Sequence, residues 1–118
     1  MTTILFTRAH GRYVALQAEG HSGYAEAGSD IVCAAVTTAF GLVECAVNDV
    51  AKAGATVTCS EKDTKLCLTL PSDMTEKQRE ICDSIMSAAY LWLSENLKQY
   101  HAYVRISVSE QCESKRRK

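Results

Sequence analysis

The feature of this sequence that most constrains its fold is a long apolar helix pattern from Asp30 to about Ala53. Apolar residues recur close to the helical period along this segment, and Gly54 follows as a terminator. They are Val32, Ala35, Val36, Ala39, Val43, Ala46, Val47 and Val50. The pattern predicts a largely buried helix, which must pack on a layer formed by the rest of the chain.

The remaining segments predict that this layer is a β-sheet. His10-Gly11 joins two alternating segments in one predicted hairpin, and the polar residues 61–64 join two more in a second. A second helix is predicted after Pro71. In order, we predict strands 3–8 and 12–19, helix 30–53, strands 55–60 and 65–70, a helix capped by Ser72, Asp73 or Thr75 and running to about Leu97, and a closing strand 101–108. This order predicts an α+β fold with two helices packed on a mainly antiparallel sheet.

Residue alternation also predicts which side chains face the core. In the second strand the even-numbered residues are assigned to the core face and the odd-numbered ones, Tyr13 among them, to the other face. In the second helix Tyr90 and Trp92 are assigned to packing, since aromatic residues at helical spacing usually belong to a core. The predicted core residues are Val14, Leu16, Ala18, Leu66, Leu68, Leu70, Ile81, Ile85, Ala88, Ala89, Trp92, Val104, Ile106 and Val108.

Length and charge indicate one globular domain without a strong electrostatic partner. The chain has 118 residues, 47% of them hydrophobic, and we predict a single domain over 1–110 with a short basic tail at 111–118. A net charge of −1 gives no field that would attract nucleic acid or an acidic membrane. The amino end lacks a signal-peptide pattern, and no apolar run is expected to span a bilayer. We therefore expect a cytoplasmic protein.

The cysteines are expected to be reduced thiols rather than disulfides or metal ligands. The six positions are widely spaced, most fall within apolar periodic segments, and none forms a Cys-x-x-Cys pair or a zinc-finger spacing with histidine. Five of the six are interpreted as small hydrophobic residues, and we expect no metal and no cofactor. The positions are 33, 45, 59, 67, 82 and 112.

The exception is Cys33, which follows a glycine-punctuated loop within the stretch from Gly20 to Val36. The glycines Gly20, Gly23 and Gly28 predict sharp turns, and Ser29 or Asp30 can cap the helix that follows. Cys33 then falls in the first helical turn, where unpaired N–H groups and the helix dipole favour a thiolate. With His21 nearby in sequence, the stretch has the residue types of a nucleophile and its base.

Spacing alone does not decide between this interpretation and a simpler one. Cys33 is also what a small core residue in an alanine-rich helix would look like, and a histidine at a strand end is more often a solvated turn residue. His10 and His101 receive only the simpler interpretation. Asp30 has two opposed effects, because a carboxylate near Cys33 opposes its ionisation whereas a helix cap supports the site. We predict that Asp30 caps the helix or contacts substrate.

The stretch resembles the ribosomal-processing cysteine proteases of the Prp family. The family pattern is Gly-His, a glycine-rich loop and then Asp-Ile-Val-Cys-Ala-Ala-Val-Ser, and this chain departs from it at Thr37, where the family has serine. The matching residues are Gly20, His21, Gly23, Asp30, Ile31, Val32, Cys33, Ala34, Ala35 and Val36. The resemblance implies that His21 and Cys33 are catalytic. It also implies that Gly20, Ser22, Gly23, Asp30 and Thr37 bind substrate or support the site.

The resemblance also implies a substrate and an assembly. The substrate would be the amino-terminal extension of a large-subunit ribosomal protein, cut after a short apolar segment with paired phenylalanines, and similar proteins are homodimers. The Cys33 thiolate would form a thioester and His21 would move the protons, with helix N–H groups available to the oxyanion. Two other classes stay open: a binding module on the ribosome that does not need Cys33, and a redox sensor in which Cys33 pairs with a second thiol.

Overall fold

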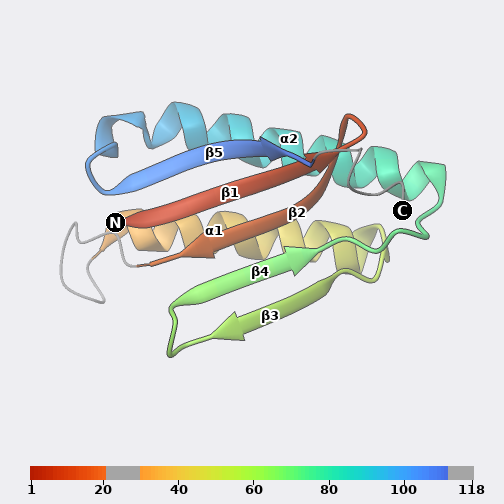
Figure 1. Ribbon diagram of the computed structural model, residues 1–118, viewed down its shortest axis with the longest axis horizontal. Helices are drawn as coiled ribbons and strands as arrows, with labels where there is room; N and C mark the ends of the chain where they lie inside the picture. The colour runs from red at the N-terminus through yellow and green to blue at the C-terminus, as the bar shows by residue number, and fades with distance from the viewer. Residues whose placement is uncertain (21–29, 112–118) are drawn as a thin grey trace.

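The computed structural model describes residues 1–20 and 30–111, and Figure 1 shows both helices on one face of a single sheet. The sheet has the strand order β3-β4-β2-β1-β5, in which β1 and β5 are parallel and the other neighbours antiparallel. The elements are β1 (Thr2–Ala9), β2 (Arg12–Glu19), α1 (Ile31–Glu44), the π-helix η1 (Cys45–Val50), β3 (Thr56–Ser60), β4 (Lys65–Thr69), α2 (Glu76–Asn96), the 3-10 helix η2 (Lys98–Tyr100) and β5 (Val104–Glu110). The predicted fold class is confirmed.

The β1–β2 hairpin forms at the predicted turn but carries a bulge that reverses one face assignment. His10 and Gly11 both have positive φ, 56° and 77°, as a two-residue hairpin turn requires. The register then shifts between Thr7 and Arg8, so that Tyr13 turns inward, is only 7% exposed and packs edge-on against Phe6. The prediction that Tyr13 faces away from the core is wrong, because strict alternation does not survive a bulge.

The first helix is buried along one side, as predicted, but it ends differently. The last part of the predicted helix is the π-helix η1, which holds more residues per turn and so rotates Val50 outward to 70% exposure. The assignment of Val50 to the core is therefore wrong. The buried residues of α1 and η1 are Val32, Val36, Phe40, Val43 and Val47.

By length and composition, the segment Ile31–Val50 is apolar enough to cross a membrane, contrary to the sequence prediction. In this fold its buried side chains belong to the same hydrophobic cluster as Phe6 and Leu68 of the sheet and Met86 of α2. The segment thus serves as the core helix of the domain.

The second helix begins at one of the three predicted caps and presents a different face to the sheet. The Thr75 hydroxyl accepts from the Gln78 N–H at 3.1 Å, and the Gln78 side chain accepts from the Thr75 N–H at 3.0 Å. Its buried residues are Cys82, Met86 and Leu93. Trp92 is 51% exposed, so its assignment to the core is wrong, whereas Tyr90 packs edge-on against Phe6 as predicted.

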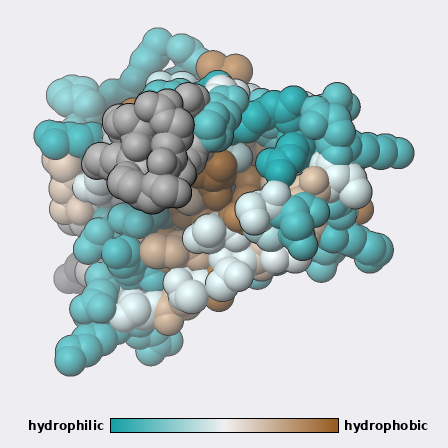
Figure 2. Space-filling view, turned by 45° about the vertical axis from the view of Figure 1, so that its right-hand side comes forward, coloured by the Kyte–Doolittle hydropathy of each residue, from teal (hydrophilic) through white to brown (hydrophobic). Residues whose placement is uncertain are grey.

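The row that includes Trp92 lies beside α1 instead of under the sheet. Ile85, Ala88 and Trp92 line an apolar groove of about 570 Å³ whose other wall includes Ile31 and Leu42 of α1. Helical periodicity correctly identified an apolar face, but it does not say whether a sheet or a neighbouring helix covers that face. Figure 2 shows one side of the molecule, where hydrophilic residues surround apolar residues gathered near the centre.

The described cysteines are all free thiols, but they are not uniformly buried. Cys82 is buried in the core, and this burial raises the pKa of its thiol above the ordinary value. Cys45 and Cys59 are exposed, so these two of the cysteines interpreted as small hydrophobic residues do not contribute to the core. Cys33 and Cys67 are half-buried.

Candidate active site

Cys33 lies in the first turn of α1, three residues after Asp30, which caps the start of the helix. Asp30 has an extended backbone, is buried, and accepts with one carboxylate oxygen from the N–H groups of Val32 and Cys33, both at 3.0 Å. The predicted capping role of Asp30 is confirmed. These two N–H groups already have an acceptor in the Asp30 carboxylate, and the expectation that the start of the helix offers N–H groups to an oxyanion stays a prediction.

Replacing Asp30 by alanine is expected to lower the free energy of unfolding by about 1–2 kcal/mol, because two N–H groups at the start of α1 lose their acceptor. Urea unfolding of both proteins measures this difference. Asp30→Asn is the matched control, since it keeps a side-chain oxygen in the same place. An Asn variant as unstable as the Ala variant would contradict a capping role and indicate that the charge itself is required.

Cys33 and Thr37 line one groove of about 500 Å³. Its apolar lining includes Ala18 of β2, Val36 of α1 and Leu66 of β4, while polar residues of the β3–β4 hairpin lie along another part of its wall. Cys33 is therefore half-buried beside this groove and is not enclosed in the core. A groove of this size, with an apolar lining and a few polar groups, is suited to a peptide or small-molecule ligand.

Gly20 lines the same groove and is held in a conformation that favours glycine. It has φ +92°, and a Cβ placed there would lie 2.5 Å from the backbone oxygen of Met1. Its N–H donates to the Thr64 carbonyl at 2.8 Å, and its carbonyl accepts from the Thr2 hydroxyl at 3.2 Å. The family glycine at this position thus has a steric reason in this fold.

The structure brings together Gly20, Cys33 and Thr37 of the residues predicted for the site, and it places Asp30 at the cap behind Cys33. The predictions for His21, Ser22 and Gly23 lie outside the described residues. These three therefore keep the roles that the sequence assigned to them as predictions.

Sequence reasoning missed the groove residues that come from distant segments. Thr2 of β1, Cys59 of β3, and Glu61, Thr64 and Lys65 of the β3–β4 hairpin all line the groove with Cys33. No local motif marks them. The only signal that could have found them is the pairing of the second hairpin with β2. In the structure, the antiparallel β2–β4 ladder brings this hairpin to the Gly20 end of the sheet.

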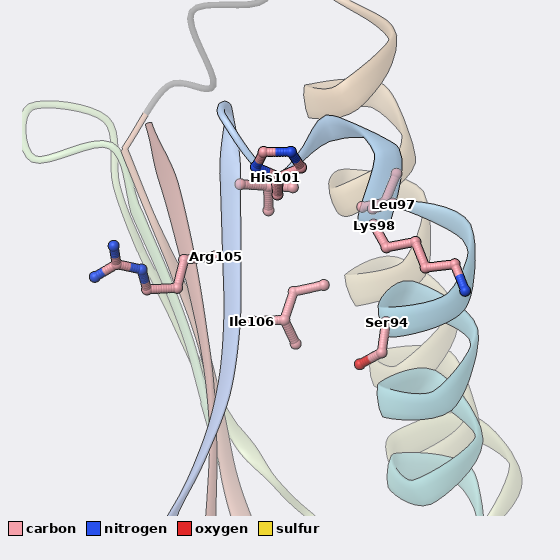
Figure 3. Close-up of a pocket in the computed structure, with 7 residues that line it drawn as sticks. Ser94, Leu97, Lys98, His101, Arg105 and Ile106 are labelled. Atoms are coloured by element: carbon pink, nitrogen blue, oxygen red, sulfur yellow. The ribbon is translucent and has the colours of Figure 1, made fainter.

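A second hollow, of about 300 Å³, lies between α2 and β5 and includes His101. Figure 3 shows the side chains of Lys98 and Arg105 directed away from each other, one on the outer side of the helix and one beyond the strand. Lys98 is within 3.4 Å of Glu95. The cationic groups of Lys98 and Arg105 therefore do not meet in this hollow (Figure 3). The groove beside Cys33 is the better candidate for an active site.

Across residues 1–20 and 30–111, no cluster of three His, Cys, Asp or Glu side chains is arranged to hold a metal ion. A thiol at a helix start beside a groove suits covalent chemistry at Cys33.

Comparison with solved structures shows that the whole fold recurs in other proteins. The ribosomal processing protease Prp from S. aureus, solved with a covalently linked product peptide, superposes with a TM-score of 0.79 at 16% identity, covering 92% of this chain and 100% of that one. The same protease with a substrate peptide gives a TM-score of 0.75 at 15% identity, with coverage of 92% and 100%. A protein from Streptococcus mutans gives 0.72 at 25% identity, with coverage of 94% and 96%.

No curated protein sequence matches this chain significantly. The profile of the family described as "Cysteine protease Prp" matches residues 1–105, which is nearly the whole chain and includes Cys33 and the groove described above. The chain therefore belongs to the cysteine protease Prp family.

Proposed function

We propose that this protease removes the amino-terminal extension of a large-subunit ribosomal protein. The observation that carries the proposal is the position of Cys33, a half-buried thiol in the first turn of α1 and at the side of a groove of about 500 Å³. Support for the substrate class comes from the S. aureus relatives, which are ribosomal processing proteases solved with substrate and product peptides.

The groove suits the apolar segment that the family resemblance implies for the substrate. Ala18, Val36 and Leu66 offer an apolar lining, and Leu66 packs partly against the core, which fixes its position. Thr37 lies one turn after Cys33 on the same groove. Relative to the family serine, Thr37 keeps the hydroxyl and adds a methyl group to the lining of the groove.

The proposed reaction passes through a thioester. The Cys33 thiol gives its proton to His21, the resulting thiolate attacks the scissile carbonyl carbon, and the C–N bond breaks as His21 passes that proton to the leaving amine. His21 then takes a proton from water, which attacks the thioester carbon, and returns that proton to the Cys33 sulfur as the C–S bond breaks and the new carboxyl group is released. Cys33 lies where the positive end of the α1 dipole stabilises negative charge.

A synthetic peptide that copies the ribosomal-protein extension tests this function. We expect the purified protein to cut it at one position and His21→Ala to cut it at least about a hundredfold more slowly, which is the usual contribution of a general acid–base group. His101→Ala is the matched control, because His101 lies in the other hollow. Cleavage by His21→Ala at the wild-type rate would refute the dyad.

The redox-sensor alternative retains one specific observation, which is that Cys59 lines the same groove as Cys33. In that function a hydroperoxide would oxidise Cys33 to a sulfenic acid, and the Cys59 thiol would then displace water to form a disulfide. Reductant separates the two functions. A protease needs Cys33 reduced and gains activity with reductant, whereas loss of cleavage on adding reductant would favour the redox function.

We also propose that the protein acts as a homodimer in the cytoplasm. The ribosomal substrate class supports that location, and the exposed apolar residues Leu42, Leu91 and Trp92 support an interface on the helix side of the molecule. Sedimentation equilibrium of the purified chain measures the assembly state.

A further inference from the structure

Three segments far apart in sequence meet at Gly20, the residue that follows β2. The Thr2 hydroxyl donates to the Gly20 carbonyl at 3.2 Å, and the Gly20 N–H donates to the Thr64 carbonyl at 2.8 Å. The Met1 carbonyl closes the third side, 2.5 Å from where a Cβ of Gly20 would lie. Both polar backbone groups of Gly20 therefore have partners, and its position is fixed by contacts on three sides.

The Thr2 hydroxyl is itself held in a defined place. Thr2 is 3% exposed although its side chain is polar, and its N–H donates to the Tyr103 carbonyl at 2.9 Å. β1 lies inside the sheet, between β2 and β5, so the residue has little freedom to move. The buried Thr2 hydroxyl makes a hydrogen bond that valine, of almost the same shape, could not make.

The backbone conformation of Thr64 also supports this contact. Thr64 adopts φ +51°, an uncommon conformation for a residue with a branched side chain, and its N–H donates to the Glu61 carbonyl at 3.3 Å. The resulting turn directs the Thr64 carbonyl to Gly20. Thr2, Gly20 and Thr64 all line the groove that contains Cys33.

We propose that Thr2 is a positioning residue for peptide cleavage, and this proposal rests on the protease function proposed above. Thr2 holds the Gly20 carbonyl in place through the hydrogen bond from its hydroxyl. It also fixes the end of the groove beside Cys33. Catalytic rates are sensitive to small displacements of reacting groups, so loosening this point is expected to slow the reaction without altering the thiol itself.

The test compares Thr2→Val, which removes the donor, with Thr2→Ser, which keeps it. We expect Thr2→Val to lower kcat/KM for the peptide by roughly tenfold or more, mainly through kcat, and Thr2→Ser to restore most of it. Thr3→Val is the matched control, because Thr3 is exposed on the opposite face of β1. We also expect the rate of Cys33 alkylation by iodoacetamide to stay the same in all three variants.

Exchange of the Gly20 amide hydrogen, followed by NMR, gives a readout that does not depend on cleavage. We expect this exchange to become roughly five times faster in Thr2→Val and to stay unchanged in Thr3→Val. If the wild type cuts no peptide, the proposed function fails, and unchanged Gly20 exchange in Thr2→Val would separately overturn the contact. Faster exchange with wild-type cleavage, or a serine variant as slow as the valine one, would overturn the positioning role.

Discussion

Replacing Cys33 by alanine is expected to abolish peptide cleavage, with a loss of kcat of at least roughly 10³-fold. The reason is chemical, because alanine has no atom that can form the thioester on which the proposed reaction depends. The fold is expected to remain, since Cys33 is half-buried and its N–H, which donates to Asp30, belongs to the backbone and is kept in the variant. Peptide cleavage followed by mass spectrometry, with thermal unfolding of the same samples, measures both quantities.

Cys45→Ala is the matched control for that experiment. It also removes one thiol from the first helical segment, but Cys45 is exposed at the start of η1 and does not line the groove. We expect it to cut the peptide at the wild-type rate. Residual cleavage by Cys33→Ala within tenfold of the wild type would mean that another group is the nucleophile, or that the protein binds the peptide without cutting it.

Local patterns in the sequence were sufficient for the parts of the fold that depend on local physics. The turn at His10-Gly11 forms where residue chemistry over four or fewer positions predicts, and each helix begins at one of the caps that the sequence offered, Thr75 for α2 and Asp30 for α1. The placement of Cys33 in a first helical turn belongs to the same class. Each of these features is decided by backbone hydrogen bonds between near neighbours, which are visible in the sequence.

The failures occur where distant segments decide the outcome. Tyr13 turns inward because the β1–β2 register shifts at Arg8, and Trp92 is exposed because its side of α2 faces a groove beside α1. For Trp92 the period of the pattern was correct but the neighbouring layer was not known, whereas for Tyr13 the bulge interrupts the alternation itself.

The residues of the candidate site fall into the same two groups, those with a local signal in the sequence and those placed by distant segments. Cys33 and Gly20 carry a local signal, whereas Thr2 and Thr64 belong to the site only because the sheet brings β1 and the β3–β4 hairpin to the end of β2. The sequence therefore pointed to Cys33, the sulfur that we propose reacts, but not to the residues that line and support the groove around it. Residues of this second kind carry no motif, and only a three-dimensional structure reveals them.

Replacing Gly20 by alanine is expected to lower the free energy of unfolding by roughly 3 kcal/mol or more, as two effects add. The first is backbone strain, because φ is +92° at this residue. The second is a collision with the Met1 carbonyl, which a new Cβ would meet at 2.5 Å. That carbonyl cannot move away freely, because it shares a peptide plane with the Thr2 N–H, which donates to Tyr103 at 2.9 Å.

Gly11→Ala separates the two effects. Gly11 also has a positive φ, +77°, but a Cβ there would meet nothing within 4 Å, so only the strain is introduced. We expect it to cost about 1 kcal/mol in urea unfolding and to leave peptide cleavage unchanged, since Gly11 lies at the far end of β2 from the groove. Equal losses of stability in the two variants would show that the Met1 carbonyl yields easily. In that case the close approach at Gly20 would not be what requires a glycine between the end of β2 and His21.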